Sequence, residues 1–238
     1  MITLQHSAAP AVGEHAAWAG SQVLLLGLLH GAVGLGPAGW LAGVAYGVAT
    51  WVLLSGAMRR SGTRSFGPAD RVTTARGVLV GGVTALVVDR WGEGVPTTVV
   101  VAFAAVALAL DFVDGRVARR TGTSSALGAR FDMEVDAFLI LVLSAHVSFT
   151  AGPWVLAIGL MRYAFVAASW ALPWLCAALP PSTARKAVAA LQGVLLVVAA
   201  SGVLPHAGYL VVFALGTLVW SFGRDALWLW ENREWSRV

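Results

Sequence analysis

Charged residues are scarce in this chain of 238 residues, where Asp, Glu, Lys and Arg together make up 12%. Soluble domains carry about 25% of these residue types. The hydrophobic share of 58% and the mean hydropathy of +0.76 point the same way. The composition therefore excludes a soluble globular domain. It predicts an all-α polytopic integral membrane protein, because a helix satisfies its own backbone hydrogen bonds within lipid.

Cysteine is also nearly absent, and the single Cys176 excludes both a disulfide framework and a thiolate metal site. The first fifteen residues have no basic stretch ahead of the first apolar run, so we expect no cleaved signal peptide. The formal net charge of +4 comes from basic residues scattered over short loops without interleaved aromatic residues. We therefore expect no nucleic-acid partner.

Apolar runs near the roughly 20-residue length of a membrane span recur along the chain. Basic residues concentrate in alternate loops between these runs, and such loops face the cytoplasm. Both chain termini are therefore expected in the cytoplasm. Pro173 lies inside one run and predicts a kink there. We predict eight spans, at about residues 17–35, 38–58, 73–89, 96–118, 127–150, 153–178, 184–203 and 206–230.

A Gly/Ser/Arg-rich stretch divides these spans into two before it and six after it. It predicts a basic linker on the cytoplasmic side, since residues 59–76 contain five arginines. The predicted organisation is a polar tail at 1–16, two extra N-terminal transmembrane helices at 17–58, a basic linker or interfacial segment at 59–72, and a six-helix catalytic core with a cytoplasmic tail at 73–238.

Four aspartates stand at helical spacing in one window of the chain. Asp111 and Asp114 are three residues apart, whereas Asp132 and Asp136 are four apart, so each pair shares one helix face. The short polar connection between the pairs predicts a helical hairpin with facing carboxylates. Like charges this close repel unless cations neutralise them. Oxygen-only ligands favour Mg²⁺ or Mn²⁺, with Ca²⁺ left open. The alternative is a cytoplasmic loop whose acids only cap helices. Capping would not require four acids on two facing helix faces.

This window resembles the signature of the CDP-alcohol phosphotransferases (CDP-alcohol phosphatidyltransferases). Every signature position and both gaps match in the pattern Asp111-x2-Asp114-Gly115-x2-Ala118-Arg119-x8-Gly128-x3-Asp132-x3-Asp136. Upstream, Asp70, Thr73 and Arg76 keep the spacing of the family's Asn-Thr-Arg pattern, with Asp in the place of Asn. Lys186 and Gln192 match a later family segment, from which Arg185 departs.

The resemblance implies a six-helix core that uses two Mg²⁺ or Mn²⁺ ions to displace CMP from a CDP-linked alcohol. It implies that Asp111, Asp114 and Asp132 are metal ligands, and that Asp136 completes the metal site and acts as the general base. It also implies a homodimer. The residues that it assigns to the cytidine diphosphate are Thr73, Arg76, Gly115, Ala118, Arg119 and Gly128.

We expect CDP-diacylglycerol as the donor, because carboxylates in the cytoplasmic half of the bilayer let the acyl tails stay in hydrocarbon while CDP reaches water. The expected acceptor is a polyol phosphate, either inositol phosphate or glycerol 3-phosphate, whose phosphate Arg162, Arg185 and Lys186 could hold. Arg162 and Asp136 each lie about 14 Å from opposite membrane surfaces at 1.5 Å per residue. In a core about 30 Å thick they are nearly level.

Other interpretations stay open. Arg162 is equally compatible with a structural ion pair, and Arg185 and Lys186 with cytoplasmic anchors. A soluble CDP-alcohol such as CDP-choline or CDP-ethanolamine could be the donor, with diacylglycerol as the acceptor. An ion or solute transporter would instead spread its acids through the bilayer on several helices. An inactive relative would not need every acid of the signature.

Overall fold

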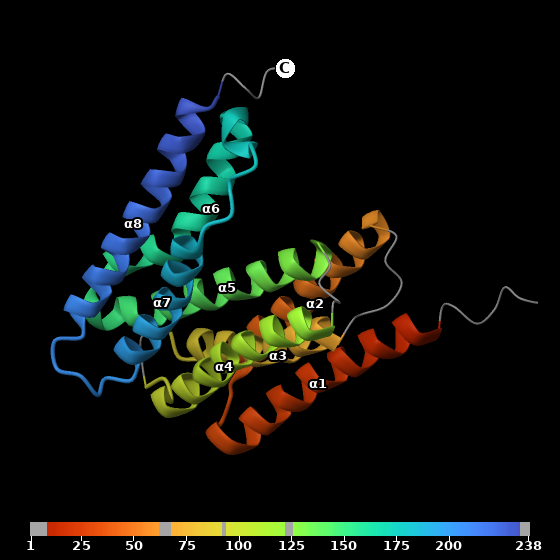
Figure 1. Cartoon of the computed structure of the whole chain (residues 1–238). Helices are drawn as coiled ribbons and strands as arrows, with labels where there is room; N and C mark the ends of the chain where they lie inside the picture. The colour runs from red at the N-terminus through yellow and green to blue at the C-terminus, as the bar shows by residue number, and fades with distance from the viewer. Residues whose placement is uncertain (1–8, 62–67, 92–93, 122–125, 234–238) are drawn as a thin grey trace, which may run out of the picture. The chain divides into compact units, whose positions relative to one another are not determined.

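The computed structural model describes residues 9–61, 68–91, 94–121 and 126–233, and these residues form helices joined by short connections (Figure 1). Side chains are described for residues 17–59, 71–91, 94–113 and 127–233. The all-α fold that the composition predicts is confirmed. The helices are α1 (Ala9–Val33), α2 (Pro37–Ser61), α3 (Pro68–Asp89), α4 (Thr97–Thr121), α5 (Ala126–Ala151), η1 (Pro153–Val155), α6 (Leu156–Ala171), η2 (Pro173–Cys176), α7 (Thr183–Ala200) and α8 (Gly208–Glu231).

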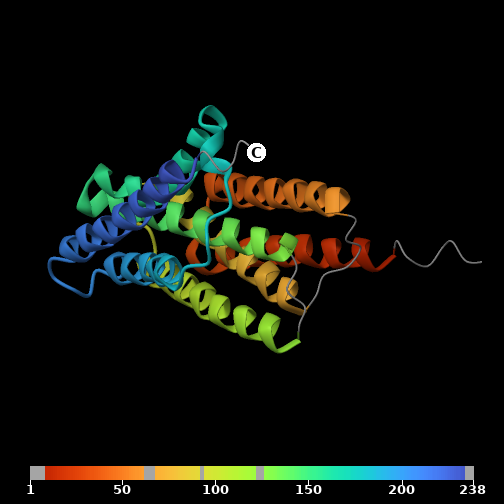
Figure 2. The ribbon, with the colours of Figure 1, turned by 45° about the horizontal axis from the view of Figure 1, so that its top comes forward.

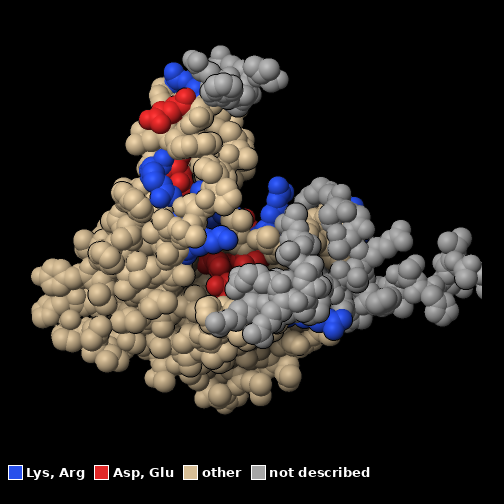
Figure 3. All heavy atoms as spheres, in the orientation of Figure 1, with Lys and Arg blue, Asp and Glu red and all other residues tan. Residues whose placement is uncertain are grey.

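Six segments of the described chain are long and apolar enough to cross a membrane, so this is a polytopic integral membrane protein. Two further helices contribute shorter apolar stretches, Ala17–Val33 and Thr97–Val113. Figure 3 shows that most of the visible surface carries neither acidic nor basic side chains, as a lipid-facing surface requires. The six segments are Pro37–Arg59, Arg71–Asp89, Leu127–Ala151, Pro153–Ala171, Thr183–Ala200 and Gly208–Glu231.

The chain forms two compact units, Met1–Leu139 and Ile140–Val238, whose boundary falls within α5. In the first unit, α3 packs against α1, α2 and α4. The two ribbon views agree that these helices run side by side (Figures 1 and 2). Every residue from 80 to 87 of α3 is buried, because neighbouring helices cover it on several sides. The first unit is therefore built around α3.

Residues at the end of α3 form hydrogen bonds to the connection between α1 and α2. The carboxylate of Asp89 accepts hydrogen bonds from the backbone N–H groups of Gly36, at 2.9 Å, and Gly39, at 3.0 Å. These groups lie at the start of α2, so Asp89 caps that helix from a different part of the chain. Arg90 donates to the carbonyl of Val33 at the end of α1, at 2.6 Å. A Cβ atom at Gly39 would lie 2.9 Å from the carbonyl oxygen of Ala85, so this approach requires glycine.

The second unit contains α6, α7 and α8. The buried amide of Gln192 on α7 donates to the carbonyl of Ala214 on α8, at 3.0 Å, and so links the two helices within the unit. α6 ends at Ala171, and Leu172 has a non-helical backbone with φ −126° and ψ 85°. The kink expected at Pro173 is therefore the end of a helix. The pyrrolidine ring excludes a helical conformation at the preceding residue, and η2 begins at the proline.

Candidate active site

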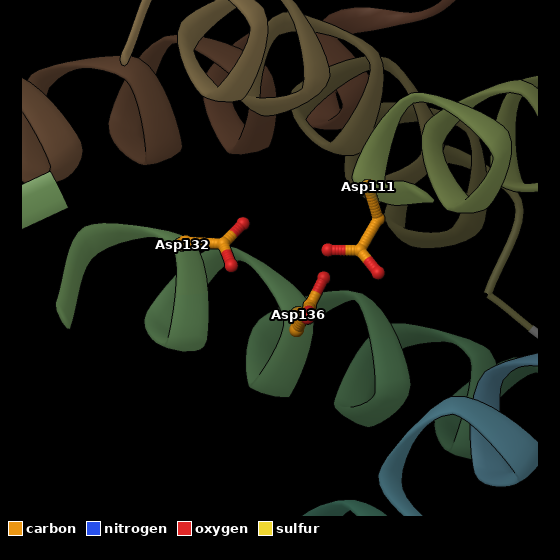
Figure 4. A group of neighbouring side chains, drawn as sticks. All are labelled: Asp111, Asp132 and Asp136. Carbon is orange, nitrogen blue, oxygen red and sulfur yellow. The ribbon is translucent and has the colours of Figure 1, made fainter. Parts of the chain in front are cut away.

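Three aspartates from two helices converge in the first unit. Asp111 lies on α4, whereas Asp132 and Asp136 lie one turn apart on α5, and Figure 4 shows their carboxylates pointing toward one another. One oxygen atom from each aspartate lies within 4.8 Å of the other two. The side chains of Asp111, Asp132 and Asp136 are 35%, 33% and 35% exposed. A small ligand can therefore reach the cluster.

Arg76 of α3 places its guanidinium among these carboxylates. Its side chain is fully buried. Nη1 donates to Asp132 and lies 3.0 Å from Oδ1 of Asp111, and Nη2 donates to Asp136. The planar guanidinium presents several donors in fixed directions, which lets one arginine bind several carboxylates at once. Arg76, Asp111, Asp132 and Asp136 form what we call the Arg76 cluster.

The chemistry of this cluster suits a hard divalent cation. Its acidic ligands are carboxylate oxygens, the ligand type that Mg²⁺ and Mn²⁺ prefer. Three carboxylates with one guanidinium leave two negative charges, so the cluster still attracts cations. The donor set therefore fits the expected ion type, and Asp111, Asp132 and Asp136 are the described residues that could hold such an ion.

The sequence predicts that Arg76 contacts the nucleotide, and it does not predict the contacts with the aspartates that the structure shows. Its motif partner Thr73 is also buried, one turn earlier on α3. Spacing along α3 places these two residues on related faces, but it carries no information about which helix they face. An arginine and several acids, all within predicted spans, are the signal that could have suggested the pairing, because buried charges are normally paired.

The other predicted nucleotide contacts lie on the two helices that carry the aspartates. Gly128 is half-buried on α5, one turn before Asp132. The remaining residues belong to the last turns of α4, and their side chains are outside the described residues. They are the predicted nucleotide contacts Gly115, Ala118 and Arg119 and the predicted metal ligand Asp114.

A second polar cluster lies in the second unit, at the start of α7 and near the end of α8. Asp225 is buried, and its two oxygens bind Nη1 of Arg185, at 3.2 Å, and Nη2 of Arg224, at 3.1 Å. Arg224 also donates to the hydroxyl of Ser182, at 3.2 Å, and Ser182 caps α7 by accepting from the backbone of Arg185. We call Ser182, Arg185, Arg224 and Asp225 the Arg185 cluster.

The Arg185 cluster lines a pocket of about 250 Å³ whose wall includes Trp228. Arg185 belongs to the predicted acceptor contacts, whereas its partners Arg224 and Asp225 were missed, because in sequence they are only a charged pair near the end of an apolar run. The neighbouring Lys186 is exposed. Arg162 is half-buried on α6 of the same unit, and its contact with an acceptor stays a prediction.

A family model described as CDP-alcohol phosphatidyltransferase matches residues 67–220, which is well over half of the chain. The matched segment contains the whole Arg76 cluster. It leaves out α1 and α2 at one end, and Arg224 and Asp225 at the other. No curated protein and no solved structure matches the chain.

Proposed function

Because the chain belongs to the CDP-alcohol phosphatidyltransferase family, we propose that it transfers a phosphatidyl group from CDP-diacylglycerol to a small hydroxyl acceptor and releases CMP. The observation that carries this proposal is the convergence of Asp111, Asp132 and Asp136 inside the matched segment. A membrane-embedded cluster of this kind is costly unless it serves a function. Its position in the apolar part of the chain suits a donor with lipid tails.

In the proposed reaction, the acceptor hydroxyl oxygen forms a bond to the phosphorus that carries diacylglycerol. The bond between that phosphorus and the phosphate oxygen of CMP breaks, and CMP leaves with the electron pair. The hydroxyl proton passes to Asp136, which we assign as the general base. In this structure the carboxylate of Asp136 accepts a hydrogen bond from Arg76.

Asp111, Asp114, Asp132 and Asp136 would hold two Mg²⁺ or Mn²⁺ ions. Such ions, when bound, would polarise the pyrophosphate and stabilise the departing CMP. Asp132 and Asp136 project from successive turns of one helix, so α5 holds two of these ligands at a fixed spacing.

We assign the cytidine diphosphate to the ends of α3, α4 and α5 nearest the aspartates. Arginine suits the pyrophosphate, because its guanidinium can donate two parallel hydrogen bonds to phosphate oxygens. Small residues leave the backbone open to the approach of a nucleotide. The assigned residues are Thr73, Arg76, Gly115, Ala118, Arg119 and Gly128.

A polyol phosphate, either inositol phosphate or glycerol 3-phosphate, is the acceptor that we propose. The Arg185 cluster supports this choice, because two guanidiniums share one carboxylate and leave one positive charge beside a pocket. We propose Arg185, Lys186 and Arg162 as contacts of the acceptor. An acceptor without phosphate would gain little from these three cations.

We further propose that the active site faces the cytoplasm, because the basic loops gather on that side. The two N-terminal helices at 17–58 and the linker at 59–72 would precede a catalytic core at 73–238. A homodimer is proposed from family membership.

Release of CMP from purified protein in lipid nanodiscs tests the proposal. CDP-diacylglycerol is supplied with Mg²⁺ or Mn²⁺ and with inositol phosphate, glycerol 3-phosphate, unphosphorylated inositol or no acceptor. We expect acceptor-dependent CMP release that EDTA abolishes. Release only from CDP-choline or CDP-ethanolamine with diacylglycerol would overturn the choice of donor. No release from any CDP-alcohol would overturn the proposed activity.

A further inference from the structure

Arg76 and a divalent cation require the same carboxylates. The guanidinium binds Asp132 and Asp136 by hydrogen bonds and forms an ion pair with Asp111. These are the three residues whose oxygens lie close enough together to hold a cation. A Mg²⁺ ion binds its oxygen ligands at about 2.1 Å. The guanidinium and a cation both carry positive charge and are attracted to the same three carboxylates, so each weakens the binding of the other.

We propose that Arg76 competes with divalent cations for Asp111, Asp132 and Asp136, and that cation binding releases its guanidinium for the phosphates of the donor. This inference rests on the proposed function, which supplies both the cations and the pyrophosphate. It deepens that function by assigning Arg76 two successive partners. The first partner is the carboxylate cluster, and the second is the substrate.

The balance of charge supports the exchange. Two divalent cations would neutralise all four aspartates of the signature, counting Asp114, and Arg76 would then have no excess carboxylate to bind. A buried guanidinium without an anionic partner is strongly unfavourable. The pyrophosphate of the donor carries two negative charges and accepts bidentate hydrogen bonds from arginine. Cation and donor should therefore bind with positive coupling through Arg76.

The packing of α3 supports the same conclusion. Arg76 is fully buried, and the helix that carries it is enclosed by neighbours from residue 80 to residue 87 and fastened at Asp89. A guanidinium that is buried to this extent needs another anionic partner when it loses the carboxylates. Its replacement partner must instead come to the cluster, as a bound substrate does.

Mn²⁺ binding, measured by electron paramagnetic resonance on the full-length protein in nanodiscs without substrate, tests the competition. We expect Arg76→Gln to bind Mn²⁺ about tenfold more tightly than wild type, because the internal competitor is gone. Arg76→Lys keeps the charge but not the planar set of donors, so we expect an intermediate, roughly threefold, tightening. Arg71→Gln removes an exposed arginine from the same helix and should leave Mn²⁺ affinity unchanged.

The coupling has its own measurement. Saturating Mn²⁺ should strengthen CMP binding to the wild type, and in Arg76→Gln this gain should shrink about fivefold. Equal or weaker Mn²⁺ binding in the Arg76 variants would overturn the inference while leaving the proposed function intact. Should Arg76→Gln fail to fold, the comparison of Arg76→Lys with wild type decides alone. A wild-type protein that binds no Mn²⁺ would overturn the proposed function, and this inference with it.

Discussion

The Arg76 cluster and the Arg185 cluster combine the same two side-chain types in opposite proportions. In the first, one arginine binds three aspartates, and in the second, two arginines bind one aspartate. The first has excess negative charge and the second excess positive charge. A count of ion pairs, three in the first cluster and two in the second, does not show this difference in the sign of the charge. Their remaining charge shows instead that one suits cations and the other suits anions.

Exposure separates the clusters as well. Arg76 is fully buried beneath partly exposed carboxylates, whereas the side chains of Arg185 and Arg224 are 35% and 38% exposed around a carboxylate that is only 12% exposed. In each cluster the outnumbered charge, Arg76 in the first and Asp225 in the second, is the most buried one. We call it the minority charge of the cluster, and we call the charges of opposite sign around it the majority charges. The majority charges therefore face the side from which a ligand arrives. The three predictions that follow test whether this difference in charge determines what each cluster binds.

Removing one majority charge from the Arg76 cluster should have the largest effect. We expect Asp132→Asn to lower the rate of CMP release about a thousandfold, because a bound metal supplies several kcal/mol of transition-state stabilisation and Asp132 is an assigned ligand. The measurement is the initial rate at saturating CDP-diacylglycerol and acceptor. Mn²⁺ affinity should fall in the same variant.

Glu134→Gln is the matched control for this change. Glu134 lies on the same helix, two residues from Asp132, but it is exposed and outside the cluster. Its neutralisation should leave CMP release within about twofold of wild type, as expected for a surface substitution. An Asp132→Asn protein with wild-type activity would show that the excess negative charge has no part in the reaction.

Removing one majority charge from the Arg185 cluster should have a smaller and more selective effect. We expect Arg185→Ala to raise the KM for a phosphorylated acceptor about tenfold or more, since a hydrogen bond to a charged group contributes about 1.5–3 kcal/mol. The KM for CDP-diacylglycerol should stay unchanged. Arg162→Ala is the companion variant for the other proposed contact, and its acceptor KM should rise as well.

Arg233→Ala is the control for these arginine variants, because Arg233 stacks on Trp230, with its guanidinium carbon 3.6 Å from the ring centroid, and lies outside the Arg185 cluster. It should leave the acceptor KM unchanged. Equal KM increases for inositol and inositol phosphate would contradict a phosphate contact, since only the second carries the group that the arginines are proposed to bind.

The sequence was sufficient to predict much of the Arg76 cluster and little of the Arg185 cluster. Asp111, Asp132 and Asp136 are linked by helical spacing and by a short connection, both of which are local properties of the chain. Their convergence follows from those properties. Arg76 is more than thirty residues away, and it meets its partners only because the tertiary fold brings its side chain to α4 and α5. Tertiary packing of this kind is not visible in the periodicity of one helix.

The same reasoning explains what was missed in the second unit. Arg185 and Asp225 are 40 residues apart, on helices that only tertiary packing brings together. A charged pair at the end of an apolar run is common in membrane proteins, because such residues anchor helix ends. The capping of α2 by Asp89, 50 residues from Gly39, was invisible for the same reason. Periodicity predicts which residues share a face, but not what that face meets.

Neutralising Asp225, the minority charge of the Arg185 cluster, should have the smallest effect. It should lower the KM for the acceptor, whereas the arginine variants raise it. Asp225→Asn leaves both guanidiniums without their shared anion, so a phosphate of the acceptor no longer competes with a carboxylate. We expect the KM for a phosphorylated acceptor to fall about threefold, a modest change because both arginines are partly exposed and screened by solvent. The KM ratio of phosphorylated to unphosphorylated acceptor measures it.

The same variant should also be less stable, because two guanidiniums that shared a carboxylate now repel each other, and its Tm should fall by a few degrees. The two readouts separate two roles of Asp225. If the Tm falls and the KM ratio rises, Asp225 orients the arginines instead of occupying them. If the Tm falls while the KM ratio stays unchanged, the cluster is an internal ion pair that only joins α7 to α8. A lower KM ratio would mean that the excess positive charge itself attracts the acceptor, as the contrast with the Arg76 cluster requires.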